Sequence, residues 1–188
     1  MPERLILASA SPQRRAILAQ VGIPFEVRVP EVEELTEGEP AAVAEENARR
    51  KAASVQGDLV LGADTVVALD GEILGKPRDA EQARAYLRRL GGRTHEVVGG
   101  VALASRDHPM RSFVEVTRVR FRAAGEELLD WYVGTGEWRG RAGGYAIQGA
   151  GAVLVSGIEG DYLNVVGMPG ALLVRLLATR FAGTYGFG

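Results

Sequence analysis

Four polar side chains crowd a short turn near the start of the chain. In "LILASASPQRRAIL", Ser9 and Ser11 are followed closely by Arg14 and Arg15. The first turn of a helix presents unpaired N–H groups and the positive end of the helix dipole, so cations are unfavourable there unless an anion is bound. Hydroxyls and arginines in this arrangement predict an anion cradle. A capped helix with solvated arginines is the alternative, and the turn alone favours neither.

A carboxylate stands inside an apolar run further along the chain. Asp64 belongs to "GADTVVALDGEILGKP", where a buried carboxylate is costly unless it is paired or binds a metal. Gly62 permits close approach of another backbone, and Lys76 lies on a loop between a glycine and a proline. A buried carboxylate and a returning lysine suit metal and phosphate together. The alternative is that Asp64 and Thr65 cap a turn at a strand end.

Two lysines stand out in a chain whose other basic residues are arginines. Lys51 and Lys76 are the only lysines among 22 basic residues, which favours positions that need a compact ammonium. Asn47 and Lys51 are four residues apart and share a helix face. Lys51 can reach a phosphate from that face, although a solvated lysine is the more common case.

An acidic loop and a glycine-rich loop offer further ligands. Glu34 can add an oxygen to a Mg²⁺ site, whereas Glu31 and Glu33 are expected to be solvated. In "GGYAIQGAG", Gln148 has both a donor and an acceptor and suits recognition of a base edge. The alternative is a loop that only needs turns. His95 and His108 are expected to be structural.

The elements that must position these groups follow from periodicity and capping. Helices are predicted over 11–22, 41–55, 79–92 and 125–136 and at the end of 159–179, with Ser11 and Asp79 as N-caps. Strands are predicted over 4–9, 24–29, 58–74 with a turn inside, 94–105, 111–122 and 152–158. This mixture predicts an α/β fold with a mixed, elongated sheet flanked by helices.

Composition excludes several classes of function. The chain has 188 residues, 46% hydrophobic and 24% charged, and a net charge of −2, so there is no overall attraction to nucleic acid or an anionic membrane. It contains no cysteine, which excludes disulfides and thiol nucleophiles. The short N-terminal apolar run falls far short of a signal peptide or membrane span, so a soluble cytoplasmic protein is expected.

The absence of familiar motifs narrows the chemistry further. There is no GxxxxGK[ST] loop, no strand-linked GxGxxG and no GxSxG elbow. The remaining groups are cations, hydroxyls and one buried carboxylate with a plausible Mg²⁺ site. Together they predict hydrolysis of a phosphate ester or phosphoanhydride.

The motifs together resemble one family. "LILASASPQRRAIL", "ENARRKA", "GADTVVALDGEILGKP", "VGGVAL" and "YAIQGAGAVLVSGIEGDYLNVVGMP" occur in order and are similar to the Maf nucleoside triphosphate pyrophosphatases. The resemblance covers nearly the whole chain and implies one Maf-like domain over 1–188. Such a domain can have two lobes with the active-site cleft between them. The fold it implies is that of the inosine triphosphate pyrophosphatases (Maf/Ham1).

The resemblance implies cleavage between the α and β phosphates, giving the monophosphate and pyrophosphate, with Mg²⁺ or Mn²⁺ as cofactor. By position, Asp64 would be the catalytic carboxylate and, with Glu34, a metal ligand. The phosphates would be bound by Ser9, Arg14, Lys51 and Lys76. Base choice would rest on Gln13, Thr65 and Gln148.

Substrate preference is where this chain departs from the family pattern. "ADT" and "IQG" resemble members that act on dTTP and UTP, yet position 13 is Gln where that type usually has Arg. The alternatives are 7-methyl-GTP-type or ITP/XTP specificity on the same fold, and a septum-formation regulator that acts by binding. The family also implies a homodimer, with no nucleic acid or membrane partner.

Overall fold

The computed structural model describes residues 4–180, and its centre is a mixed seven-stranded sheet in the order β2-β1-β3-β5-β6-β7, with β4 paired to β3. The strands are β1 (Leu5–Ala8), β2 (Phe25–Arg28), β3 (Leu59–Leu69), β4 (Glu72–Ile73), β5 (Thr94–Ser105), β6 (His108–Phe121) and β7 (Val155–Glu159). β1 runs parallel to β2 and β3, and the other pairs are antiparallel. The predicted α/β class with a mixed sheet is confirmed.

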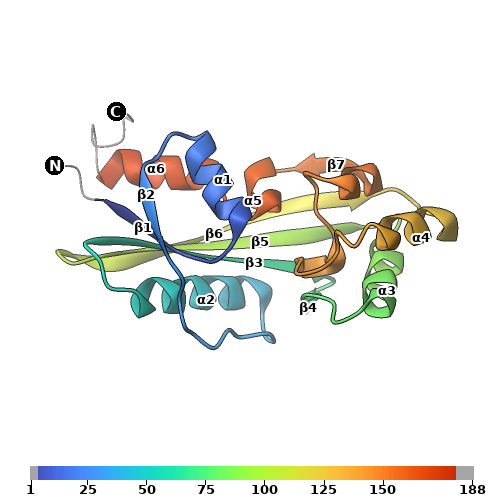
Figure 1. Ribbon diagram of the computed structural model, residues 1–188, viewed down its shortest axis with the longest axis horizontal. Helices are drawn as coiled ribbons and strands as arrows, with labels where there is room; N and C mark the ends of the chain where they lie inside the picture. Colours follow the sequence, from blue (N-terminus) through green and yellow to red (C-terminus); the bar gives the residue numbers. More distant parts are fainter. Residues whose placement is uncertain (1–3, 181–188) are drawn as a thin grey trace.

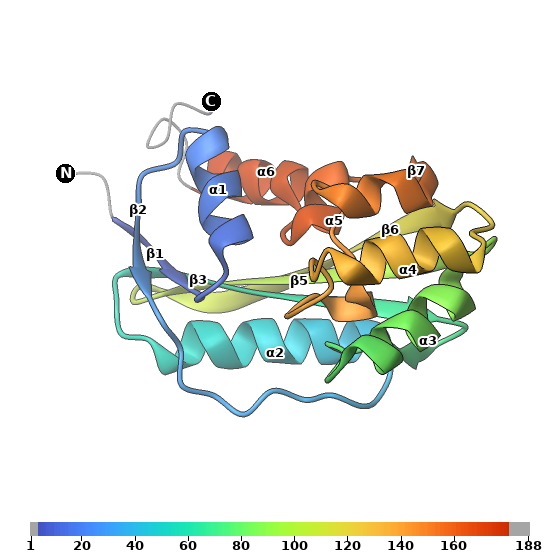
Figure 2. The same ribbon diagram turned by 45° about the vertical axis from the view of Figure 1, so that its right-hand side comes forward.

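Helices cover both faces of this sheet. They are α1 (Pro12–Gln20), α2 (Pro40–Ser54), α3 (Ala80–Leu90), α4 (Glu126–Gly134), α5 (Tyr162–Val166) and α6 (Gly170–Arg180), with 3₁₀ turns η1 (Ala142–Gly144) and η2 (Ala150–Leu154). The molecule is elongated along β3, β5 and β6, with α2 on one side and α1, α5 and α6 on the other (Figure 1). α3 and α4 pack at the end of the molecule remote from β1 and β2 (Figure 2).

Local sequence signals account for most element boundaries. The Ser11 hydroxyl accepts from the Arg14 amide at the start of α1, and Asp79 accepts from the Gln82 amide at the start of α3, so both predicted N-caps are confirmed. Gly22 follows α1 with φ +73°, a conformation that costs glycine little. α3 buries Ala83, Leu87 and Leu90 at helical spacing.

Two boundaries differ from those predicted. The segment 152–158 was expected to be a strand, but it begins within η2 and becomes extended only at Val155. β6 begins at His108, which was expected in the hairpin loop. Both differences occur where strand pairing decides the backbone. β7 pairs only with the C-terminal end of β6, with an irregular register at Arg120 and Phe121, and His108 pairs with Ser105 across the hairpin.

Apolar residues form separate clusters on the two faces of the sheet. α1 and α6 pack on β1, β3 and β5 around Leu7, Ile17 and Leu173. α2 packs on the opposite face through Val43 and Ala44. β3 is therefore buried on both sides, which explains its continuous apolar run. Within residues 4–180, none of the helices has the length and apolar character needed to cross a bilayer. The two-lobe arrangement stays a prediction.

Candidate active site

The turn between β1 and α1 is organised around a buried hydroxyl. Ser9 is 3% exposed, and its Oγ accepts from the Ser11 amide and from Arg14 Nη1, both at 3.1 Å. Ser11 Oγ also donates to the Gln13 side-chain oxygen at 3.0 Å. Arg15 is exposed and takes no part in this network; it donates to the Ala10 carbonyl at 2.9 Å. Only one of the two adjacent arginines therefore enters the site.

Arg14 joins the N-terminal turn to two distant segments. Its Nε donates to the Gly167 carbonyl at 3.0 Å, and its Nη2 to Thr65 Oγ1 at 3.3 Å. Thr65 donates to the same carbonyl at 2.9 Å. Burial lowers the pKa of Arg14, while the charges of Asp64 and Glu34 act to raise it. Because arginine stays protonated in proteins, this wall of the site carries a fixed positive charge.

Asp64 lies on β3 and is held by two side chains of α2. It is 7% exposed; its Oδ1 accepts from Lys51 Nζ at 2.7 Å and its Oδ2 from Asn47 Nδ2 at 3.0 Å. α2 comes this close because β3 has Gly62 beneath it, where a Cβ would stand 2.1 Å from the Ala48 carbonyl oxygen. A carboxylate has about four lone-pair positions, so acceptor capacity remains on Asp64 for a water molecule.

Lys51 is not on a solvated helix face. It is 5% exposed, and its ammonium pairs with Asp64 and with Glu34 Oε1, at 2.7 and 2.8 Å. The alternative interpretation of Lys51 as a solvated lysine is therefore wrong. Two of its three protons are used by carboxylates, so its expected role in phosphate binding is limited to the third and to its charge.

The acidic loop is held at the site by two hydrogen bonds between its backbone and the side chain of Asn47. The Asn47 amide accepts from the Leu35 N–H at 2.8 Å and donates to the Leu35 carbonyl at 2.9 Å. This fixes the segment beside α2 and brings Glu34 to Lys51. Glu31 and Glu33 are exposed, as predicted. One acidic residue of the three is thus selected by a long-range contact.

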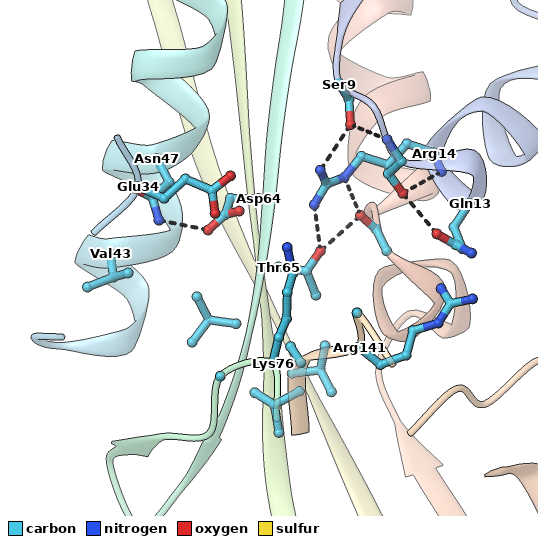
Figure 3. A pocket seen from close by; sticks show the side chains of 18 of the residues that line it. Ser9, Gln13, Arg14, Glu34, Val43, Asn47, Asp64, Thr65, Lys76 and Arg141 are labelled. Atoms are coloured by element: carbon cyan, nitrogen blue, oxygen red, sulfur yellow. Dashed lines mark hydrogen bonds between the residues drawn. The ribbon is translucent and has the colours of Figure 1, made fainter. Parts of the chain in front are cut away.

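These groups line a cavity of about 850 Å³ (Figure 3). Asp64, Glu34 and Asn47 lie on one side of it, Ser9, Gln13 and Arg14 on the other, and Lys76 enters from the loop after β4. The cavity is lined by every predicted site residue except one: Ser9, Gln13, Arg14, Glu34, Lys51, Asp64, Thr65 and Lys76. Gln148 is exposed and does not line the cavity. Its role in base choice stays a prediction.

Tyr145 and Arg141 were not predicted to be site residues. Tyr145 lines the cavity, and its hydroxyl shares a 2.7 Å hydrogen bond with His95 Nε2. His95 is 2% exposed, and burial lowers its pKa to about 4, so it is a neutral core residue as expected. Arg141 also lines the cavity. The run "GRAGGY", a basic residue among glycines, was the signal available for it.

The donors suit a cation that takes most of its ligands from elsewhere. Among residues 4–180 no group of three His, Cys, Asp or Glu side chains could hold a metal. Asp64 and Glu34 form a carboxylate pair, both in contact with the Lys51 ammonium. Mg²⁺ commonly takes one or two protein carboxylates and completes its shell with water and substrate phosphates. The residues present therefore fit such an ion only together with an anionic ligand.

Comparison with known proteins agrees with this geometry. The family model for Maf-like protein matches residues 4–180. A dTTP/UTP pyrophosphatase of Symbiobacterium thermophilum is 49% identical over 185 residues, 95% of this chain and 94% of that protein. One from Pyrococcus furiosus is 44% identical over 180 residues, 93% and 94% of the two chains.

Solved structures show the same fold at low identity. A HAM1 protein from Coxiella burnetii matches with a TM-score of 0.52 and 16% identity, covering 94% of this chain and 99% of that one. The match to the family model spans every element described above, including all residues that line the cavity. The chain belongs to the Maf-like protein family.

Proposed function

We propose that this protein is a nucleoside triphosphate pyrophosphatase that releases pyrophosphate from dTTP and UTP. Its relatives of 44–50% identity carry the name dTTP/UTP pyrophosphatase. The cavity of about 850 Å³ is of the size that small-molecule sites have. Its walls combine a fixed arginine, two lysines and a serine with one nearly buried carboxylate. A polyanion with a hydrolysable bond suits this set of groups.

The observation that carries the proposal is the setting of Asp64. Its carboxylate is buried, oriented by Lys51 and Asn47, and faces the cavity. In this position it would accept a proton from an attacking water. As the water oxygen bonds to phosphorus, the bond to the α–β bridging oxygen breaks and pyrophosphate leaves. Positioned general bases contribute roughly 10²- to 10⁴-fold to rate.

Cations around the carboxylate would stabilise the charge that develops on the phosphate oxygens. Arg14 is already oriented by Ser9, Thr65 and Gly167, so little reorganisation is needed when substrate binds. Lys76 is exposed at the rim and has freedom to follow the phosphate chain.

Asp64 and Glu34 would hold Mg²⁺ or Mn²⁺ together with substrate phosphates. When bound, the ion would neutralise charge on the phosphate oxygens and fix their position. Gln13 and Thr65, which line the cavity near Arg14, would contribute to base choice, and Gln148 would join them if its loop turns inward. We further propose a cytoplasmic homodimer that removes non-standard nucleotides before they enter nucleic acids.

Pyrophosphate release from a panel of dTTP, UTP, CTP, 7-methyl-GTP, ITP and XTP tests the function, with Mg²⁺ or Mn²⁺ present. Asp64→Asn should lower turnover about 100- to 10,000-fold with an unchanged circular dichroism spectrum. Asp70→Asn is the matched control, because Asp70 is an exposed turn residue with φ +52°, which asparagine tolerates. Retained activity in Asp64→Asn would refute the assignment, and no release from any nucleotide would favour a role in binding.

A further inference from the structure

Arg141 is a charged cavity residue to which neither the motifs nor the relatives' names assign a role. It lies in the turn between Gly140 and Gly143, directly before η1, and it is half-buried. Its side chain lies on the same side of the cavity as Gln13 (Figure 3). Gln13 is uncharged, and Arg141 places a guanidinium on the same side of the cavity.

The turn that carries Arg141 is docked on the loop that carries Lys76. The Gly143 amide donates to the carbonyls of Leu74 and Gly75, at 2.9 and 3.1 Å. Gly143 has φ +68°, and a Cβ there would stand 2.8 Å from a methyl group of Val67. A side chain at this position would be strained and would clash, so glycine permits the contact. The backbones of Arg141 and Lys76 are thus held in one rigid unit at the cavity.

Arg141 is not paired with a carboxylate, whereas two arginines of α3 are. Arg88 pairs with Glu126 and Arg89 with Glu72, each at 2.6 Å. In the described part of the chain, the Arg141 side chain makes neither a salt bridge nor a hydrogen bond. Its positive charge acts to lower the pKa of Tyr132. Lys76 likewise has no such contact with any residue from 4 to 180. Two cations with free donors line the cavity, and two of its lining carboxylates, Glu34 and Asp64, are already paired with Lys51.

We infer that Arg141 is a further substrate-binding residue, which acts with Lys76 to bind the phosphate chain. This inference rests on the proposed function and deepens it. The planar guanidinium can donate two parallel hydrogen bonds to one phosphate, which a lysine cannot. Arg14 and Ser9 on the turn before α1, and Arg141 and Lys76 on the docked loops, then bind one anion in the cavity that Asp64 faces.

Binding of inorganic triphosphate tests this inference without the nucleoside. Calorimetric titration of the full chain in Mg²⁺ buffer should show that Arg141→Gln weakens binding about 10- to 100-fold, as expected for lost hydrogen bonds to a charged group. Arg141→Lys, which keeps the charge, should recover part of the affinity. The matched control is Arg139→Gln: Arg139 is exposed, stacks on Trp138 with 4.7 Å to the ring centroid and lies outside the cavity lining.

The outcomes separate this inference from the proposed function. If Arg141→Gln binds triphosphate as the Arg139→Gln control does, the inference is wrong, even if the wild type cleaves dTTP. Failure of the wild type to bind triphosphate would also overturn it. If the wild type binds triphosphate and Arg141→Gln does not, but no nucleotide is cleaved, the phosphate site stands and the proposed reaction fails. Circular dichroism of each variant confirms that the comparison is made on folded protein.

Discussion

His95 should make the stability of this protein depend on pH from pH 6.5 downwards, a window that begins above the range in which most carboxylates titrate. The imidazole projects from β5 and makes edge-to-face contacts with Phe121 at 4.9 Å and Tyr145 at 5.4 Å between ring centroids. Its Nδ1 has no hydrogen-bond partner among the residues described. A second proton would therefore place a charge and an unpaired N–H in an apolar cluster.

The magnitude follows from the difference in pKa between the two states. Burial lowers the pKa of His95 from 6.5 to about 4. As pH falls below 6.5, the unfolded chain takes up the proton and the folded chain does not, so the stability present above pH 6.5 is lost progressively down to about pH 4. At about 1.4 kcal/mol per pH unit, the free energy of unfolding should decrease by about 2 kcal/mol between pH 7 and pH 5 from this group.

Urea unfolding at half-unit intervals from pH 7 to pH 5 measures this slope, and the comparison is with His95→Gln. The variant is expected to be less stable at pH 7, because it loses ring contacts, but to have a much flatter dependence on pH. His108→Gln removes an exposed imidazole at the start of β6 and should keep the wild-type slope.

Two results would refute this reasoning. One is a wild-type slope near zero between pH 6.5 and pH 5, which would mean that folded His95 is protonated as easily as in the unfolded chain. The other is an equal slope in wild type and His95→Gln, which would assign the pH dependence to other groups. Either result would also mean that the wall of the cavity behind Tyr145 is more polar than the structure shows.

Two further substitutions test how α2 is held on the sheet. Lys51→Met should reduce the free energy of unfolding by about 3 kcal/mol, since it leaves a buried carboxylate unpaired. In the same urea experiment the control Arg50→Met, which breaks an exposed ion pair within the helix, should cost under about 0.5 kcal/mol. Equal losses in the two variants would contradict the burial of the Lys51–Asp64 pair. Gly62→Ala should cost at least about 1–3 kcal/mol, because its Cβ would meet the Ala48 carbonyl at 2.1 Å. Gly134→Ala at the end of α4, with nothing within 4 Å of its Cβ, should have little effect on the thermal midpoint, and a tolerated Gly62→Ala would refute the close contact.

Much of the fold could be predicted because its signals are local. Ser11 and Asp79 cap helices through contacts within three residues, and the Asp70–Gly71 turn follows from residue type. Asp64 was also recognisable, since a carboxylate in an apolar run is unusual wherever that run folds. These features needed no knowledge of which segments meet.

The composition of the site, in contrast, depended on segments that meet across the chain. The sequence put Lys51 on a helix face and left open whether it binds phosphate or is solvated; only the packing of α2 over Gly62 buries it beside Asp64. Nothing in the sequence indicated that the hydrogen bonds between Asn47 and Leu35 would bring Glu34 to the same ammonium. Whether a helix face is exposed or buried is decided only by the element that packs, or does not pack, on it.

The sequence by itself therefore determined the element types, the caps and the presence of a carboxylate and cations suited to phosphate chemistry. Tertiary structure decided which of them work together. Arg14 reaches Gly167, 153 residues away, and Arg141 enters the cavity because Gly143 docks on the loop before Lys76. Propensity and capping act over a few residues, whereas burial and charge pairing depend on contacts whose distance along the chain carries no local signal.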